Sequence, residues 1–288
     1  MPGFESIELS DTQPFSLDKT LSCGQAPRFF KNGDWWYGIV RDRVFKIKQE
    51  GNVLTFGGVG VDADFVRDYF CLDFDLNRVY DLMSKDIFGR EAVEENYGLR
   101  IVNQDTWECL IFQMTVNRIR TKGVTDRISR ISAKLGKKIE FDGMEFYTLP
   151  RPEELVEAGL PALKSCNIGY LAENIMLAAK RVGENPDWEE ELAELSYDDA
   201  VNMLKGFKGV KHRVAEWILL LSQRRYDAFP VDAHIRDIFT KIYLKGTYFG
   251  VNDEKIDNLI CEIASKNFEN YRGYALEYLF NTRDLLRE

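Results

Sequence analysis

Short runs in which apolar and polar residues alternate fill the chain between residues 7 and 58. The runs are rich in aromatic and β-branched residues, and residues 32–33, 41–42 and 50–52 interrupt them with glycine, asparagine and aspartate. A period of two is typical of strands with one buried face, and such interruptions favour tight turns. The pattern predicts an antiparallel meander.

The spacing changes after Asp62, where apolar residues recur at intervals of three and four. This is the period of helices with one apolar face, and about ten such segments follow, almost to the C-terminus. We therefore predict an α+β fold, with a small antiparallel sheet domain before a helical region. The predicted domains are residues 1–85, in which helices flank the sheet, and residues 86–288.

Composition narrows the class of protein. The chain has 288 residues, of which 45% are hydrophobic and 30% charged, as in globular domains. No run approaches eighteen apolar residues, and the first ten residues do not resemble a signal peptide, so we expect an intracellular protein without a membrane partner. The five cysteines are scattered and lack metal-ligand spacing, which predicts free thiols and no catalytic metal.

The net charge of −9 argues against a protein that coats nucleic acid, although the charge is unevenly distributed. A basic run lies between residues 116 and 138, where only Asp126 is acidic. Its members are Arg118, Arg120, Lys122, Arg127, Arg130, Lys134, Lys137 and Lys138. Such a run is either a solvated helix face or a surface for phosphates.

The most informative segment is residues 204–213, where one predicted helix ends, a glycine-containing turn follows and a second helix begins. Gly206 and Gly209 permit unusual dihedral angles and a close approach of the backbone to a ligand. Lysines surround the turn at positions Lys205, Lys208 and Lys211. A hairpin of this kind presents backbone N–H groups that can bind phosphate, although an ordinary helix connection has the same appearance.

Asp232 follows Pro230 and precedes the next predicted helix. Its ordinary role would be an N-cap whose carboxylate accepts N–H groups of that helix. A carboxylate held in this way can also stabilise a cationic sugar during cleavage of an N-glycosidic bond. Both roles are compatible with one residue.

Taken together, these segments resemble the helix-hairpin-helix DNA glycosylases, and most of all the 8-oxoguanine DNA glycosylase branch. The matching pieces occur in family order across nearly the whole chain. They are residues 21–25 (LSCGQ), 104–110 (QDTWECL), 168–170 (IGY), 204–210 (LKGFKGV), 230–234 (PVDAH), 273–275 (GYA) and 279–280 (LF).

The resemblance implies a sheet domain like the TATA-binding protein, followed by a helical core in two parts. It also implies that the hairpin backbone at Gly206, Lys208, Gly209 and Lys211 binds a DNA phosphate, with a monovalent cation as a possible structural cofactor. Three further positions acquire implied roles: His234 as a phosphate contact, Tyr170 as the side chain that wedges into the duplex, and Gly24 as a reader of the flipped base.

One departure from the family concerns the nucleophile. Where the bifunctional enzymes carry a lysine that forms a Schiff base, this chain has Arg213. A guanidinium stays protonated and cannot form that intermediate. Lys211, two residues earlier, could replace the lysine, but phosphate contact is the role we expect for it. The sequence therefore favours a monofunctional enzyme in which Asp232 orients water.

A second departure concerns the base pocket. The resemblance places the flipped base between Trp217 and Phe280, and two aromatic faces suit an electron-poor ring. Leu276 stands where the family reads 8-oxoguanine with a glutamine, and Leu171 stands where an arginine reads the opposite cytosine. Arg118 lies near a void-filling asparagine. These changes resemble the alkylpurine glycosylases, although both aromatic residues could be ordinary core residues.

The sequence thus leads to a DNA glycosylase of base excision repair that binds duplex DNA containing a damaged base, as a monomer. Our main expectation is a monofunctional enzyme for alkylated or deaminated purines. The first alternative is an 8-oxoguanine glycosylase with apurinic-site lyase activity through Lys211. The second, from another class, is a protein that binds lesions without cutting.

Overall fold

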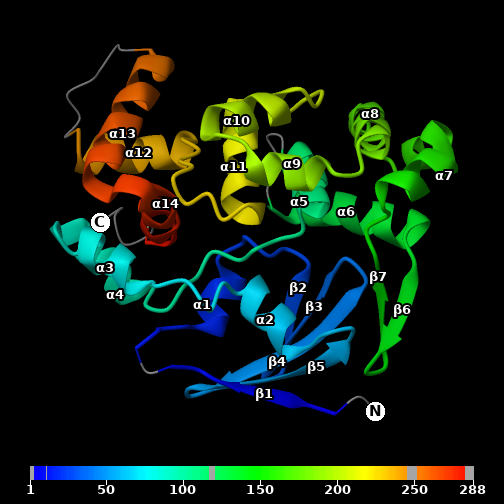
Figure 1. Ribbon diagram of the computed structural model, residues 1–288, viewed down its shortest axis with the longest axis horizontal. Helices are drawn as coiled ribbons and strands as arrows, with labels where there is room; N and C mark the ends of the chain where they lie inside the picture. The colour runs from blue at the N-terminus through cyan, green and yellow to red at the C-terminus, as the bar shows by residue number, and fades with distance from the viewer. Residues whose placement is uncertain (1–2, 11, 117–120, 245–251, 283–288) are drawn as a thin grey trace.

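The computed structural model describes residues 3–10, 12–116, 121–244 and 252–282, and it shows a sheet on one side and helices on the other (Figure 1). The antiparallel strands are β1 (Glu5–Glu8), β2 (Phe29–Asn32), β3 (Trp35–Val40), β4 (Arg43–Glu50) and β5 (Val53–Val59). Their order in the sheet is β1-β5-β4-β3-β2. The predicted α+β fold and the predicted meander are confirmed.

The alternation of the sequence accounts for the buried face of this sheet. Phe45 and Ile47 of β4, with Leu54 and Phe56 of β5, are completely buried and point to the same side. The helices α1 (Leu17–Ser22) and α2 (Ala63–Tyr69) cover that side (Figure 1). The result is a separate N-terminal core.

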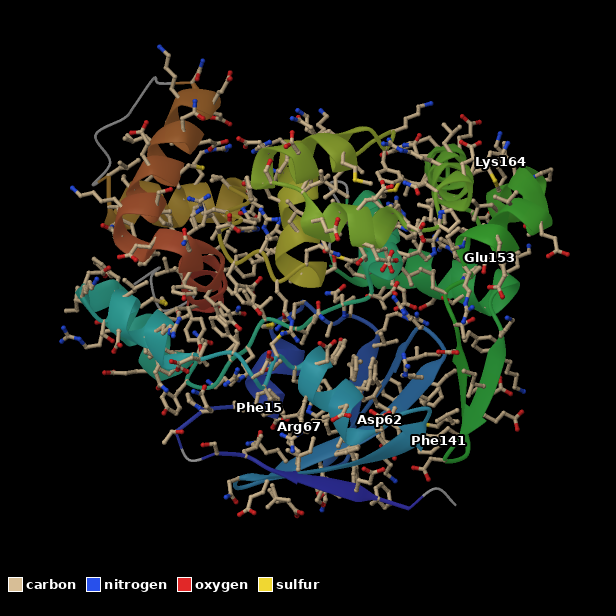
Figure 2. The ribbon with its side chains drawn as sticks, in the orientation of Figure 1. Phe15, Asp62, Arg67, Phe141, Glu153 and Lys164 are labelled. Carbon is tan, nitrogen blue, oxygen red and sulfur yellow. The ribbon has the colours of Figure 1, made fainter. Side chains whose placement is uncertain are left out.

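The other face is partly covered by a hairpin that the sequence analysis missed, formed by β6 (Lys138–Phe141) and β7 (Met144–Tyr147). Asp142 at its tip accepts hydrogen bonds of 2.6 Å from the Tyr37 hydroxyl and from Lys46. Phe141, labelled in Figure 2, packs with residues of this small second core. The hairpin therefore joins the sheet to the helical region.

The helical region forms the largest core. Its helices are α3 (Asn77–Met83), α4 (Ile87–Glu95), α5 (Thr106–Thr115), α6 (Thr121–Leu135), α7 (Pro152–Lys164), α8 (Leu171–Glu184), α9 (Trp188–Glu194), α10 (Tyr197–Lys205), α11 (His212–Ser222), α12 (Ala233–Ile242), α13 (Asp253–Phe268) and α14 (Arg272–Asn281). Because α3 packs with α13 and α14, the chain passes from the core of the sheet domain to the large helical core near residue 75. The domain boundary that we predicted at residue 85 stays a prediction. Within the described ranges, every helix is too short or too polar to span a bilayer.

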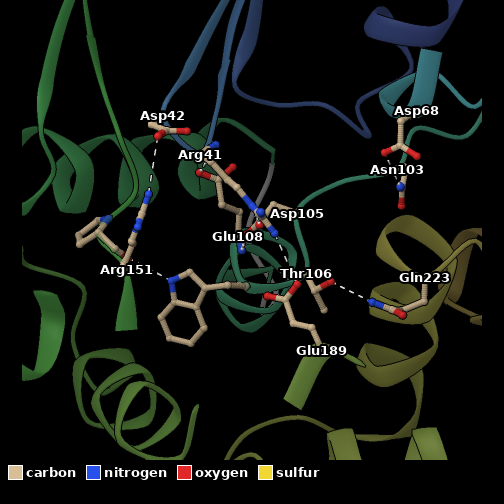
Figure 3. A network of polar contacts seen from close by, with 12 residues as sticks. Arg41, Asp42, Asp68, Asn103, Asp105, Thr106, Glu108, Arg151, Glu189 and Gln223 are labelled. Carbon is tan, nitrogen blue, oxygen red and sulfur yellow. Dashed lines mark hydrogen bonds and ion pairs between the residues drawn. The ribbon is translucent and has the colours of Figure 1, made fainter. Parts of the chain in front are cut away.

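Ionic contacts at Arg41, in the turn between β3 and β4, link the sheet domain to the helices (Figure 3). Its guanidinium pairs with Asp105 and lies 3.5 Å from a carboxylate oxygen of Glu189. Its backbone N–H donates to Glu108, which also pairs with Arg28 at 2.7 Å. A cavity of 580 Å³ opens beside this junction.

Burial raises the pKa of Glu108 and of Glu189 to about 7, from an ordinary value of 4.5. At Glu189 the negative charge of Asp105 adds to the effect of burial, and Arg41 opposes both. A carboxyl whose pKa is raised in the folded state contributes stability below pH 4.5, and this contribution is lost as the pH rises towards 7.

Glu189→Gln should remove part of this pH dependence, because an amide carries no charge to desolvate. We expect the wild-type chain to lose about 1 to 3 kcal/mol relative to Glu189→Gln between pH 4.5 and 7.5. Urea denaturation at both pH values measures this difference. Glu190→Gln, which changes an exposed neighbour, is the control; an equal pH dependence in both variants would contradict the assignment.

Candidate active site

Helices α10 and α11 form the predicted hairpin, and the turn between them contains residues 206–211. Gly209 has a φ of +95°, a backbone conformation that is strained for any residue with a side chain. Lys211 is the N-cap residue of α11 in an extended conformation, and its side chain makes no capping hydrogen bond. The N-terminus of an eleven-residue helix is therefore left without a side-chain cap.

Asp232 is the N-cap residue of α12, as the sequence predicted. Its Oδ1 accepts hydrogen bonds of 2.9 Å from the backbone N–H groups of His234 and Ile235. In the described part of the chain no donor is bonded to Oδ2. One carboxylate oxygen thus holds the helix, and the other is available to a ligand.

The segment that leads to Asp232 is anchored by Glu216, a buried residue of α11 that the sequence analysis missed. Glu216 Oε1 accepts a 2.7 Å hydrogen bond from the Tyr197 hydroxyl and a 3.4 Å bond from the N–H of Phe229. This contact joins α11, α10 and the approach to α12. A glutamate in an apolar helix was the only sequence signal for it.

The two candidate nucleophiles lie at the start of α11. Lys211 and Arg213 are both exposed, and neither forms an ion pair with Asp232 or any other residue in the described ranges. His234 is also exposed, and its ring contacts Phe280 edge to face at 5.8 Å. The structure thus brings His234 and Phe280 together.

The candidate base pocket is only partly open. Trp217 and Phe280 are half-buried and pack against the large core, so each retains some exposed surface. Leu276 is completely buried, and its assignment to the base pocket stays a prediction. It lies on the core-facing side of α14, where the neighbouring Ala275 is equally buried.

Gly24 follows α1, is exposed and has a φ of +101° with open space around it. Its neighbour Cys23 packs against the large core. Burial raises the pKa of Cys23 to about 12, and the charge of Glu277 adds to that increase. The turn at Gly24 therefore lies on the side of the sheet domain that faces α14.

Tyr170 precedes α8 and is 62% exposed, at the end of a loop in which Cys166 and Ile168 are buried. Arg130 of α6 donates to the carbonyls of Cys166 at 3.0 Å and Asn167 at 3.3 Å. These contacts fix the loop that presents the tyrosine.

Most of the basic run is engaged within the protein. Lys134 binds the carbonyl of Ser165, and Arg127 binds the carbonyl of Thr115. Lys137 and Lys138 pair with acidic residues of their surroundings: Glu154, Glu140 and Glu145. For the members that can be placed, these contacts favour a helix face engaged within the protein over a continuous surface for phosphates; Arg118 lies outside the described residues.

Over the ranges that the structure describes, no three side chains of histidine, cysteine, aspartate or glutamate are grouped to hold a metal ion. The five cysteines are free thiols.

The sequence and the overall fold of the chain are similar to those of known proteins. Residues 6–110 match the family described as 8-oxoguanine DNA glycosylase, N-terminal domain. The N-glycosylase/DNA lyase OGG1 of Arabidopsis thaliana is 29% identical, over 97% of this chain and 80% of that protein.

Two solved structures cover the chain almost completely. MBOgg1 in complex with a low affinity DNA ligand has a TM-score of 0.88 and 29% identity, over 99% of this chain and 100% of that one. The 8-oxoguanine glycosylase/lyase of Clostridium acetobutylicum, in complex with DNA containing cytosine opposite 8-oxoguanine, has a TM-score of 0.85 and 25% identity, over 99% and 98%.

The chain is a DNA N-glycosylase that is similar in sequence and fold to the helix-hairpin-helix superfamily. Its N-terminal domain and its overall fold are similar to those of the 8-oxoguanine DNA glycosylase branch. The resemblance drawn from the sequence is confirmed.

Gly209→Ala should destabilise the hairpin, because a methyl group would lie 2.9 Å from Asn174 Nδ2 and the positive φ would become strained. We expect a loss of about 1 to 3 kcal/mol in the free energy of unfolding. Gly183→Ala is the matched control, since Gly183 lies in α8 with open space around it. That variant should gain stability slightly; equal effects of the two substitutions would refute the strained turn.

Proposed function

We propose that this enzyme excises 8-oxoguanine from duplex DNA, with Asp232 as the catalytic carboxylate and an associated lyase activity. The observation that carries the mechanism is that the two carboxylate oxygens of Asp232 differ: Oδ1 caps α12, whereas Oδ2 has no donor in the described chain. The match of residues 6–110 to the 8-oxoguanine glycosylase domain supports the choice of lesion. This reverses the order of our sequence-based expectations, in which the alkylpurine enzyme came first.

The chemistry requires charge stabilisation at the sugar. When the N-glycosidic bond breaks, its electrons leave with the base and positive charge develops on the deoxyribose ring. A carboxylate fixed by two N–H groups can stabilise that charge without reorganising. Trp217 and Phe280 would hold the flipped base, Gly24 would approach its edge, and Tyr170 would fill the gap in the duplex.

DNA binding would depend on the hairpin. The backbone N–H groups at Gly206, Gly209 and Lys211, with the Lys208 side chain, would bind one phosphate, and His234 would bind another. A monovalent cation held by backbone carbonyls of the turn remains part of the proposal, since such a cation needs no cluster of acidic ligands. The enzyme would act as a monomer.

The lyase step needs an amine. Arg213 cannot form a Schiff base, whereas the Lys211 amine is exposed two residues away. Relatives named N-glycosylase/DNA lyase support such a step. The Lys211 amine would form a bond to C1′ as the bond from C1′ to the base breaks, and would lose a proton. Cleavage of the C1′–O4′ bond would then give an imine between Lys211 and C1′. The imine acidifies the C2′ proton, and loss of that proton would break the C3′–O bond and release the 3′ phosphate.

A second candidate is the monofunctional glycosylase for alkylated or deaminated purines, with water as nucleophile. Trp217 favours it, because its partly exposed indole suits an electron-poor base. Duplexes with 8-oxoguanine, hypoxanthine or alkylated adenine distinguish the candidates. Release of 8-oxoguanine with spontaneous nicking supports our proposal, and release of the other bases with nicking only after alkali supports the second candidate. Shifted but intact DNA throughout would contradict both.

Asp232→Asn should abolish base release while the chain stays folded, because asparagine is also a good N-cap but has no charge. We expect base release in single-turnover assays to fall at least 100-fold, with duplex binding within a few-fold of wild type. Asp232→Ala is the control that also removes the cap, at about 1 kcal/mol in unfolding free energy. A fully active Asp232→Asn enzyme would refute the mechanism.

Arg213→Lys should create or strengthen lyase activity, because it places an amine where the bifunctional relatives have theirs. Borohydride trapping of a covalent adduct on lesion-containing DNA measures the effect, and we expect at least a tenfold increase. Lys211→Ala in the wild-type background should abolish trapping. Unchanged trapping in Lys211→Ala would show that another amine acts.

A further inference from the structure

Helix α8 lies against the hairpin, although it is not one of its two helices. Asn174 and Arg181 are seven residues apart on α8, which places them on one face two turns apart. A methyl group at Gly209 would lie 2.9 Å from Asn174 Nδ2, and one at Gly206 would collide with the Arg181 guanidinium. The two side chains therefore lie over the two glycines of the turn.

Asn174 has an unusual environment for an amide. Only 8% of the residue is exposed, yet its side chain makes no hydrogen bond with any residue in the ranges that the structure describes. In the described chain, the fully buried side-chain atoms without a partner are Ser132 Oγ and Tyr226 Oη, so the unpaired Asn174 amide retains access to solvent. An amide left unpaired beside Gly209 is therefore suited to donate to a ligand of the turn.

Arg181 supplies charge at the same place. Its guanidinium carbon lies 4.6 Å from the ring centre of Phe207, and within the described chain it has no acidic partner. Stacking on a ring occupies the flat face of a guanidinium and leaves its N–H edges for other acceptors. Helix α8 carries two acids: Glu173 is already paired with Lys164 at 2.8 Å, and Glu184, three residues after Arg181, forms no ion pair with it in the described chain.

We propose that Asn174 and Arg181 form a second backbone-binding element of this enzyme, which extends the hairpin site to an additional DNA phosphate. The inference rests on the proposed function, because it takes duplex DNA as the ligand. The uncapped N-terminus of α11, the unpaired amide and the stacked guanidinium all favour an anion. Neither residue belongs to the basic run, which the protein uses largely for its own contacts.

The salt dependence of binding tests the proposal, because each phosphate contact adds about 0.9 to the slope of log affinity against log salt. Arg181→Gln should lower the slope by about 0.9, the value for one phosphate contact. The ratio of wild-type to variant affinity should therefore fall about three- to fourfold between 50 and 200 mM KCl. Lys180→Gln, an equal charge change on an exposed position of α8, is the control. Fluorescence anisotropy with an undamaged duplex and with an abasic-site duplex gives the affinities.

Asn174→Leu separates binding from folding. If the amide is reserved for DNA, leucine should leave the melting temperature equal or higher while affinity falls several-fold. A lower melting temperature with unchanged affinity would show a structural role and overturn the proposal for Asn174. The same salt slope for Arg181→Gln and Lys180→Gln would overturn it for Arg181. A wild-type chain that binds neither duplex would instead refute the proposed function, and this inference with it.

Discussion

The burial of α11 is the constraint on which the candidate site depends. Ala215, Ile218, Leu219 and Leu220 are completely buried, so the helix cannot shift without opening the large core. The first turn of α11 is exposed and directly follows the hairpin turn. Glu216, one turn further on, holds the approach to Asp232 through Tyr197 and Phe229. One rigid element therefore sets both the position of the hairpin turn and the position of the carboxylate.

The sequence predicted elements that carry a clear period or a turn with special dihedral angles. The strands β2 to β5 and the long helices α5, α8 and α11 fall into this group. Missed elements are short: α1, α4, α9 and the β6–β7 hairpin have four to nine residues each. The hairpin was detectable, because Asp142-Gly143 lies between alternating residues.

The site was predictable where backbone chemistry defines it and less so where packing decides. Gly209 and Asp232 follow from a positive φ and an N-cap, both of which have sequence preferences. The complete burial of Leu276 and the internal pairing of the basic run could not be predicted, because both depend on contacts between distant segments. Asn174 and Arg181 became visible only when α8 was placed against the hairpin.

Tyr170 and Arg181 lie at the start of α8 and in its last turn. At about 1.5 Å per residue, the helix keeps their backbones roughly 16 Å apart. Because the helix is stiff, the distance between the two positions is fixed. If Tyr170 opens the duplex and Arg181 holds its backbone as proposed, the two contacts must then fall a constant distance apart on the DNA, whatever the base between them.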